Sequence, residues 1–389
     1  MSQPASHPRV LLITNDFPPR AGGIESYLRD FCAQLPPESL TVLASTRAPQ
    51  HDIDTHDAAA PYEIVRLRDR VLLPLPHVAR AAARIIAERK IDVVWFGAAA
   101  PLALLGPACR RAGAKRIVAT THGHEVGWSM IPGARLALRR IGRSADAITY
   151  ISNYTRRRFE SAFGTSCQYF WMPSAVDATF FHPDAAAAAR IRQRHDIAAD
   201  TPVIACISRL VTRKGQDMLI RALPELIGDY PAVQLLIVGV GPKEKALRQL
   251  AERFGVLGHV IFTGRVDYAD LPGYYAAANI FAMPARTRGA GLDVEGLGIV
   301  YLEAQACAVP VIAGDSGGAP ETIIDGSTGM VCPGGDYHAI GRAISGLLAD
   351  TDRAVAMGQA GRRHVEQNWT WSAMGEQLRA VLAGTAAPN

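Results

Sequence analysis

Short β-branched runs alternate with helical patterns along the whole chain, and this alternation restricts the possible folds more than any other feature. In the first half, the strand-like runs are residues 9–14, 40–45, 62–67, 92–97, 116–121 and 147–152. Helical patterns separate most of them, at 24–35, 77–90, 101–112 and 133–144. Strands that alternate with helices in this way form parallel sheets covered on both faces. The predicted fold class is therefore α/β.

The second half repeats the pattern after an irregular connection. Its strand-like runs are VIACIS, QLLIVG, VIFTG, IFAMP, VPVIAG and GMVC, with helical patterns near 215–228, 243–254, 299–308 and 336–349. The connection follows Trp171, where proline and an alanine run interrupt the alternation. Because 389 residues suit two domains, we expect two doubly wound, Rossmann-like domains, 1–175 and 176–370. The cleft between facing domains, beyond the carboxyl ends of the strands, is the expected site.

Composition excludes several other classes of protein. With 49% hydrophobic and 20% charged residues, the chain is too apolar to be intrinsically disordered. Its six cysteines are scattered without a CxxC pair or zinc spacing, as is typical of reduced thiols in a cytosolic protein. The N-terminus does not read as a signal peptide, and glycine and proline interrupt the longest apolar stretch, 93–109. We therefore expect no membrane span.

Charge is distributed unevenly between the two halves. Residues 1–175 contain 22 Lys and Arg against 14 Asp and Glu, a net charge of +8. Residues 176–389 contain 19 against 22, a net charge of −3. This asymmetry indicates either different partners for the two halves or one half that faces an anionic surface.

Two glycine- or cation-bearing loops follow predicted strands and suit an anionic ligand. Gly22 and Gly23 precede a helix, so backbone amides can approach an anion there, although a plain strand-to-helix turn explains them equally well. In SRLVTRKGQD, Arg209 and Lys214 can hold a diphosphate, whereas Arg213 reads as a solvated loop residue. The chain has no Walker A loop. It also has no complete GxGxxG motif, because Glu244 replaces the third glycine after Gly239 and Gly241. A dinucleotide-binding oxidoreductase is thus disfavoured.

The segment 286–313 holds two acidic residues in apolar and glycine-rich surroundings. Glu295 lies in a glycine-rich loop, and Glu303 lies in the helix that begins near Ile299. If the segment were helical throughout, eight residues at ~1.5 Å each would separate them by about 12 Å. That exceeds the ~5–9.5 Å of glycosidase carboxylate pairs, so separate roles are predicted. After the next strand, Gly317 and Gly318 either approach the ligand or only make the turn.

Other acidic and histidine motifs are weaker. In THGHEVGW, the HxH pair of His122 and His124, with Glu125 beside it, suggests a metal site, but the HxH pair lacks a further ligand nearby, and a structural or hydrogen-bonding histidine is commoner. The two DxD pairs, at 52–54 and 350–352, read as solvated. No metal site is expected.

Taken together, the motifs resemble those of the retaining, nucleotide-sugar-dependent glycosyltransferases of the GT-B fold. The GGI loop, the S-R-L-x-x-x-K-G segment, and E-G-L-G followed by E-A occur in order and at the family spacing. NDFPPRAGGI, WFGAAAPLAL, THGHEVGWSM and PARTRGAGLDVEGLGIVYLEAQA look like the bacterial phosphatidylinositol mannosyltransferase B group. The resemblance implies GDP-mannose as donor and phosphatidylinositol monomannoside as acceptor. It also implies that the C-terminal helix, 371–389, packs back on the first domain.

The resemblance implies a role for each matching residue. Gly22 and Gly23 approach the donor phosphate, while Arg209 and Lys214 bind the diphosphate and stabilise its charge as it leaves. Glu295 contacts the hydroxyls of the sugar, and Glu303 binds the ribose. The remaining matches are the backbone of Val266 near the base, His122 near the reaction centre and Asp16 in the acceptor pocket.

The implied mechanism is a front-face displacement in which the leaving phosphate oxygen helps to deprotonate the acceptor. Cations stabilise the leaving group, so neither a metal nor another cofactor is expected. Two alternatives stay open: a related hexosyltransferase with another nucleotide sugar or glycolipid acceptor, and a non-catalytic nucleotide- or lipid-binding module. The sequence does not distinguish guanine from other bases; Asp267 or Asp270 accepting from guanine is a hypothesis. No nucleic-acid partner is expected.

The basic residues of the first half predict a membrane-binding patch. Arg135, Arg139 and Arg143 recur at helical spacing with Arg140 beside them, and Arg156–Arg158 form a second cluster. One interpretation is that these arginines only form a solvated helix face without a binding role. The functional interpretation is peripheral docking on anionic lipid, which places a cytoplasmic protein at the inner face of the plasma membrane.

Overall fold

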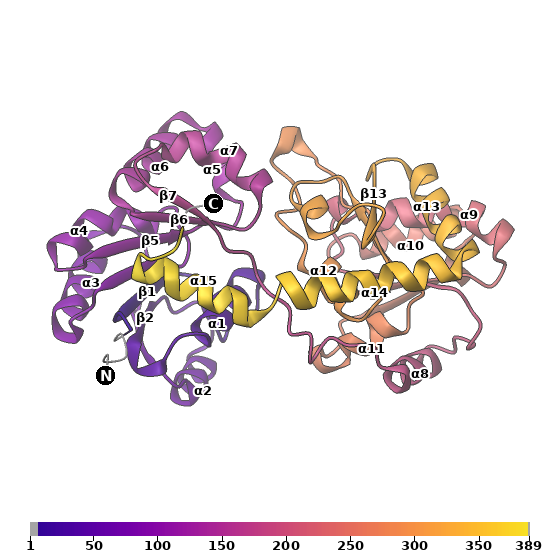
Figure 1. Cartoon of the computed structure of the whole chain (residues 1–389), viewed down its shortest axis with the longest axis horizontal. Coiled ribbons are helices and arrows are strands. Elements are labelled where there is room, and N and C mark those ends of the chain that lie inside the picture. The colour runs from indigo at the N-terminus through magenta and orange to yellow at the C-terminus, as the bar shows by residue number, and fades with distance from the viewer. Residues whose placement is uncertain (1–6, 388–389) are drawn as a thin grey trace. The chain divides into compact units, whose positions relative to one another are not determined.

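The computed structural model describes residues 7–387, which form two compact units (Figure 1). The first unit runs up to Ser174 and resumes at Trp371, and the second runs from Ala175 to Thr370. The sequence-based boundaries, 175/176 and 370/371, lie within one residue of these. Among the residues described, none of the helices combines the length and apolar character needed to cross a membrane.

The first unit is built on a seven-stranded parallel sheet in the order β3-β2-β1-β4-β5-β6-β7. Its strands are β1 (Val10–Thr14), β2 (Leu40–Ala44), β3 (Glu63–Arg66), β4 (Val93–Phe96), β5 (Arg116–Thr120), β6 (Ala147–Tyr150) and β7 (Gln168–Trp171). Every residue of β1 is buried, as expected of a central strand with helices on both faces. The strand order reverses beside β1, so the loops after β1 and β4 border the crevice in which such sheets bind ligands.

Helices from both ends of the chain cover this sheet. They are α1 (Gly23–Cys32), α2 (Gln50–Ala59), α3 (Pro76–Arg89), α4 (Gly106–Arg111), α5 (Glu125–Met130), α6 (Pro132–Ser144), α7 (Asn153–Phe163) and α15 (Trp371–Ala383). The last helix, yellow in Figure 1, packs on the first unit. There Trp371 meets Phe31 edge to face at 5.2 Å, and Arg116 Nε donates to the carbonyl of Val381 at 2.9 Å.

The second unit has a six-stranded parallel sheet in the order β10-β9-β8-β11-β12-β13. Its strands are β8 (Val203–Ile207), β9 (Gln234–Val238), β10 (Val260–Gly264), β11 (Ile280–Met283), β12 (Val311–Gly314) and β13 (Gly329–Cys332). Its helices are α8 (Ala185–Arg194), α9 (Gln216–Asp229), α10 (Glu244–Arg253), α11 (Leu271–Ala276), α12 (Ile299–Ala306), α13 (Tyr337–Ala349) and α14 (Thr351–Asn368). The order reverses beside β8, which places the loops after β8 and β11 at the crevice.

The α/β prediction is confirmed, and the errors are local. Asp52 and Asp54, which the sequence indicated to be solvated, are exposed, but they lie in a helix that was not predicted, α2, which buries little more than Ile53. Pro107 and Gly106 divide the predicted helix 101–112 into a 3-10 turn and α4. Asp350 is not merely solvated: its side chain caps α14 by accepting from the Arg353 N–H.

Candidate active site

Lys214 belongs to the loop after β8 and is the first buried charge of the site. A 3-10 turn, Thr212–Lys214, ends at Gly215, and α9 begins at the next residue. Gly215 has a φ of 80°, and a Cβ there would lie 2.2 Å from the carbonyl oxygen of Pro284. This turn therefore requires glycine, and it leaves Lys214 only 9% exposed.

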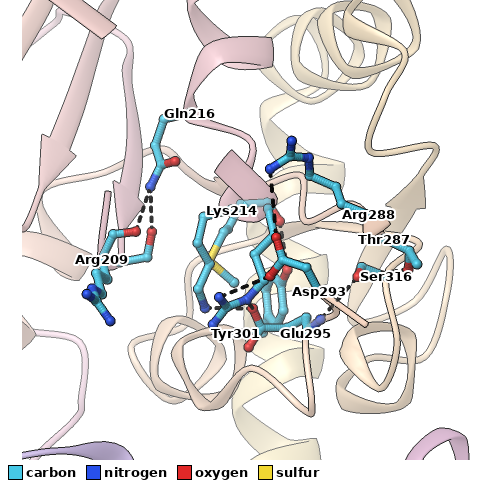
Figure 2. A network of polar contacts seen from close by, with 12 residues as sticks. Arg209, Lys214, Gln216, Thr287, Arg288, Asp293, Glu295, Tyr301 and Ser316 are labelled. Atoms are coloured by element: carbon cyan, nitrogen blue, oxygen red, sulfur yellow. Dashed lines mark hydrogen bonds and ion pairs between the residues drawn. The ribbon is translucent and has the colours of Figure 1, made fainter. Parts of the chain in front are cut away.

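The loop after β11 brings Glu295 against Lys214. The distance from Lys214 Nζ to Glu295 Oε2 is 2.7 Å, and Glu295 is 7% exposed. The Glu295 N–H donates to Ser316 Oγ at 3.1 Å, and its carbonyl accepts from the Gly318 N–H at 3.0 Å. These contacts, shown in part in Figure 2, make a buried ion pair of two residues that the sequence singled out separately.

The glycine pair after β12 supports the Glu295 loop. Gly317 has a φ of 60°, and a Cβ there would lie 1.9 Å from the Glu295 carbonyl oxygen. Of the two roles considered for Gly317 and Gly318, the structure favours the turn, because their immediate neighbour is protein backbone. They act on the site through Glu295.

Glu303 lies on α12, and its side chain is partly exposed. Its Oε2 accepts from the Tyr275 hydroxyl at 2.6 Å, and Tyr275 is fully buried on α11. Burial raises the pKa of Glu303 to about 7, while the Tyr275 hydrogen bond and the charge of Lys214 oppose that rise. Because α12 starts only at Ile299, Glu295 and Glu303 do not share a helix.

Arg209 stays outside the buried pair. Its side chain is exposed and makes no ion pair with any residue in 7–387, and Figure 2 shows it apart from Lys214 and Glu295. Its backbone is fixed because Gln216 Nε2 donates both to the Arg209 carbonyl at 3.2 Å and to Ser208 Oγ at 2.9 Å. The guanidinium is thus free to meet a ligand.

The segment after β10 holds the residue expected near the base. Val266 is partly exposed just beyond the strand, and Asp267 is exposed beside it. Asp270 is committed elsewhere, since Arg194 Nη1 lies 2.6 Å from its Oδ2. Of the two carboxylates considered for guanine recognition, this contact leaves Asp267 as the better candidate.

His122 follows β5 in the first unit and is held in one tautomer. Its Nε2 lies 2.7 Å from the Gly97 carbonyl, which can only accept, so Nε2 carries the proton and Nδ1 keeps a lone pair. Its ring meets Tyr27 edge to face at 4.9 Å. Burial lowers the pKa of His122 to about 4, so the ring is neutral at pH 7.

Glu125 fixes the loop that carries His122, a role that the sequence did not reveal. Its fully buried Oε2 accepts from the N–H groups of both His122 and Gly123 at 3.1 Å, while His124 Nε2 lies 3.2 Å from Oε1. No group of three or more His, Cys, Asp or Glu side chains suited to a metal is found within residues 7–387. The motif is thus a carboxylate-braced histidine loop.

The GGI loop of the first unit is shaped around a second buried carboxylate. A Cβ at Gly22 would lie 2.2 Å from Glu25 Oε2, whereas Gly23 has open space around its Cβ position. Glu25 is 5% exposed in the first turn of α1 and pairs with Arg20 at 3.4 Å. Gly22 therefore makes room for the side chain of Glu25, which the sequence analysis overlooked.

Asp16, the candidate acceptor residue, also has a partner that the sequence analysis missed. Arg47 Nη1 lies 3.1 Å from Asp16 Oδ1, and both side chains remain partly exposed after β1 and β2. Their partial exposure leaves both charges accessible to a polar ligand.

Two of the four arginines predicted to form one patch on α6 also donate hydrogen bonds to neighbouring segments. Arg135 donates to the Ser129 carbonyl and Ser161 Oγ, and Arg139 donates to the carbonyls of Ser161 and Ala162, so both tie α6 to its neighbours. Arg140 and Arg143 are exposed. Arg135 and Arg139 therefore brace α6, while the side chain of Arg139 stays exposed like those of Arg140 and Arg143.

Comparison with known proteins gives the family. The family of glycosyl transferases group 1 matches residues 188–364, and glycosyltransferase family 4 matches residues 21–180. A GDP-mannose-dependent alpha-(1-6)-phosphatidylinositol monomannoside mannosyltransferase of Mycolicibacterium smegmatis is 56% identical over 96% of this chain and 98% of its own. A GDP-mannose-dependent monoacylated alpha-(1-6)-phosphatidylinositol monomannoside mannosyltransferase of Corynebacterium glutamicum is 54% identical over 96% and 97%. The chain belongs to the glycosyltransferases.

Solved structures of low sequence identity agree with the fold. Anabaena HepE in complex with UDP superposes with a TM-score of 0.80 at 22% identity, over 97% of this chain and 100% of that one. Sucrose-phosphate synthase of Thermosynechococcus elongatus gives 0.78 at 23% identity, over 96% and 98%. The GT-B assignment made from the motifs is confirmed, and the oxidoreductase alternative is excluded.

The ionisation of Glu303 in this glycosyltransferase gives a testable pH dependence. Its carboxyl holds a proton up to about pH 7 when folded but only to about 4.5 when unfolded, so folding loses stability as pH rises through this window. Glu303→Gln should abolish that loss, on the order of 2 kcal/mol, in urea unfolding measured from pH 5 to 8. Tyr275→Phe, which removes the opposing hydrogen bond, should extend the window to higher pH.

The exposed Glu252 on α10 provides the control, and Glu252→Gln should follow the wild-type profile. Parallel profiles for Glu303→Gln and the wild type would show that Glu303 does not titrate in this range.

Proposed function

We propose that this glycosyltransferase moves mannose from GDP-mannose to phosphatidylinositol monomannoside with retention of configuration. The observation that carries the proposal is identity of 51–56% over nearly the full length of relatives whose names specify that donor and acceptor. The charged groups beyond β8 and β11 suit a diphosphate-linked sugar, which supports the same donor class.

The proposed reaction breaks the bond from the sugar to the diphosphate and forms a bond from the sugar to the acceptor. The anomeric carbon–phosphate oxygen bond breaks with its electrons moving to GDP, and an acceptor hydroxyl oxygen bonds to that carbon and passes its proton to the leaving phosphate. Arg209 and Lys214 stabilise the charge that develops on the diphosphate. Because these two cations supply that stabilisation, the proposed reaction uses no metal or other cofactor.

The other assigned residues orient the substrates. Glu295 accepts from the sugar hydroxyls, Glu303 accepts from the ribose, and the backbone of Val266 contacts the base. His122 Nδ1, which the Gly97 contact keeps unprotonated, accepts a hydrogen bond from a hydroxyl of the sugar. Amides at Gly22 and Gly23 approach the donor phosphate, and Asp16 with Arg47 contacts the acceptor.

The substrate assignment is tested by transfer assays with GDP-mannose, UDP-glucose and ADP-glucose, each offered with phosphatidylinositol monomannoside or unmannosylated phosphatidylinositol. We expect product only from GDP-mannose with the monomannoside, and an equal rate in excess EDTA. A preferred UDP- or ADP-sugar would identify a related hexosyltransferase instead, and rescue of an EDTA-inhibited enzyme by magnesium would overturn the metal-free mechanism.

Substitutions of the two cations should differ in their effect on the melting temperature. Arg209→Ala should lower kcat roughly 10²–10³-fold without changing the melting temperature, because Arg209 is exposed and makes no ion pair with any described residue. Lys214→Ala should lower kcat similarly and also lower the melting temperature, because it leaves the buried Glu295 with only the longer 3.7 Å contact to Arg213. The exposed Lys245 of α10 provides a control, and Lys245→Ala should match the wild type. Normal turnover in both cation variants would contradict the diphosphate role.

We propose further that the first unit attaches reversibly to anionic lipid at the cytoplasmic face of the plasma membrane. Exposed apolar side chains gather at the α5–α6 junction, where Met130 is 50%, Ile131 60% and Leu136 55% exposed. Arg140 and Arg143 are exposed one and two turns beyond Leu136 on α6. Apolar side chains beside free arginines suit insertion at an anionic bilayer surface.

Paired double variants test this surface. Arg140→Gln/Arg143→Gln should weaken binding to phosphatidylglycerol-containing vesicles roughly 30-fold at low salt, since each arginine contributes ~1 kcal/mol. Arg135→Gln/Arg139→Gln should lower the melting temperature, because these residues brace α6. Arg140→Gln/Arg143→Gln should hydrolyse the soluble donor, GDP-mannose, at the wild-type rate. Equal vesicle binding by that variant and the wild type would identify the patch as a solvated face.

A further inference from the structure

Arg213, read from the sequence as a solvated loop residue, lies inside the charge network of the second unit. Its Nε is 3.7 Å from Glu295 Oε2, and its Nη1 is 3.5 Å from Asp293 Oδ1. The Nε is buried and has no hydrogen-bond partner among the described residues. Glu295 Oε2 also has no aligned hydrogen bond, although Lys214 lies 2.7 Å away. Two buried atoms without an aligned hydrogen bond thus lie 3.7 Å apart, although the Arg213 side chain as a whole is 33% exposed.

We propose that Arg213 is a positioning residue that takes over as the counter-charge of Glu295 when Lys214 turns to the diphosphate of the donor. This inference rests on the diphosphate role proposed for Lys214. Glu295 is only 7% exposed, so the departure of Lys214 would leave a buried carboxylate with only the longer contact to Arg213, which is destabilising. A shift of less than 1 Å brings Arg213 Nε to hydrogen-bond distance from Glu295 and reduces that destabilisation.

Backbone and side-chain contacts hold Arg213 where this exchange needs it. The Arg286 N–H donates to the Arg213 carbonyl at 2.8 Å. The Arg286 guanidinium in turn binds Asp217, at the start of α9, through two hydrogen bonds of 2.9 and 2.8 Å. Because the first contact uses only backbone atoms of Arg213, substitutions of its side chain leave the loop anchored.

Arg288 supplies a matched control on the same loop. Its Nη1 lies 3.8 Å from Asp293 Oδ2, and its side chain is 46% exposed with no contact to Glu295. If Arg213 served only to hold the loop through Asp293, removing either arginine would have a similar effect.

The test measures binding of GDP, which carries the diphosphate but no sugar, by calorimetry. Arg213→Gln should weaken GDP binding roughly tenfold, as expected for loss of a hydrogen bond to a charged group. Arg213→Lys should restore most of the affinity, and Arg288→Gln should leave it unchanged. In the Arg213→Gln background, adding Glu295→Gln should return the affinity toward that of Glu295→Gln alone, because a neutral side chain needs no counter-charge.

Wild-type affinity for GDP in Arg213→Gln would overturn the proposal, as would a double variant no tighter than Arg213→Gln. Melting temperatures of all variants identify any loss of fold. If Arg213→Gln is unfolded, the GDP affinity of Arg213→Lys is compared with that of the wild type. Failure of the proposed function gives a different result: Lys214→Ala would bind GDP normally, or the wild type would prefer UDP or ADP, in which case the Arg213 series is read with that nucleotide.

Discussion

The ion pair between Lys214 and Glu295 is the contact on which the second unit's site depends. Each residue is less than a tenth exposed, so the pair gains little net stability after the cost of removing two charges from water. Its value is positional, because the two backbone turns that form it accept only glycine at Gly215 and Gly317. Those turns fix a cation and a carboxylate side by side at the carboxyl edge of the sheet.

The first unit uses a related arrangement at the carboxyl edge of its own sheet. Glu25 fills the space that Gly22 leaves open, and Glu125 braces the loop of His122 through two backbone amides. In both units, therefore, carboxylates of the chain already lie where anionic phosphates are expected. Beside such carboxylates a cation favours the binding of a phosphate, and Arg209 is exposed and makes no ion pair with any described residue.

Sequence patterns predicted the features that depend on residues close together in the sequence. Apolar runs located the central strands, and the motifs located Lys214, Glu295 and His122 individually. The short strand β7 and the polar helix α2 were missed because neither has a distinct apolar period, and tertiary contacts stabilise them. Pairings across long sequence separations, such as Arg213 with Glu295, leave no periodic signal, so Arg213 read as solvated.

The net charge of the first half also requires the structure to interpret it. Many of its arginines satisfy internal acceptors: Arg66 binds Asp57 and two backbone carbonyls, and Arg139 binds carbonyls of α7. Helical spacing groups residues on one side of a helix, but it does not tell whether that side faces a neighbouring helix or solvent. On α6 the exposed apolar residue Leu136 identifies the solvent-facing side, and Arg140 lies one turn away on it. The charge available to an external anionic partner is therefore set by which arginines lack internal acceptors, and the net charge of +8 overstates that charge.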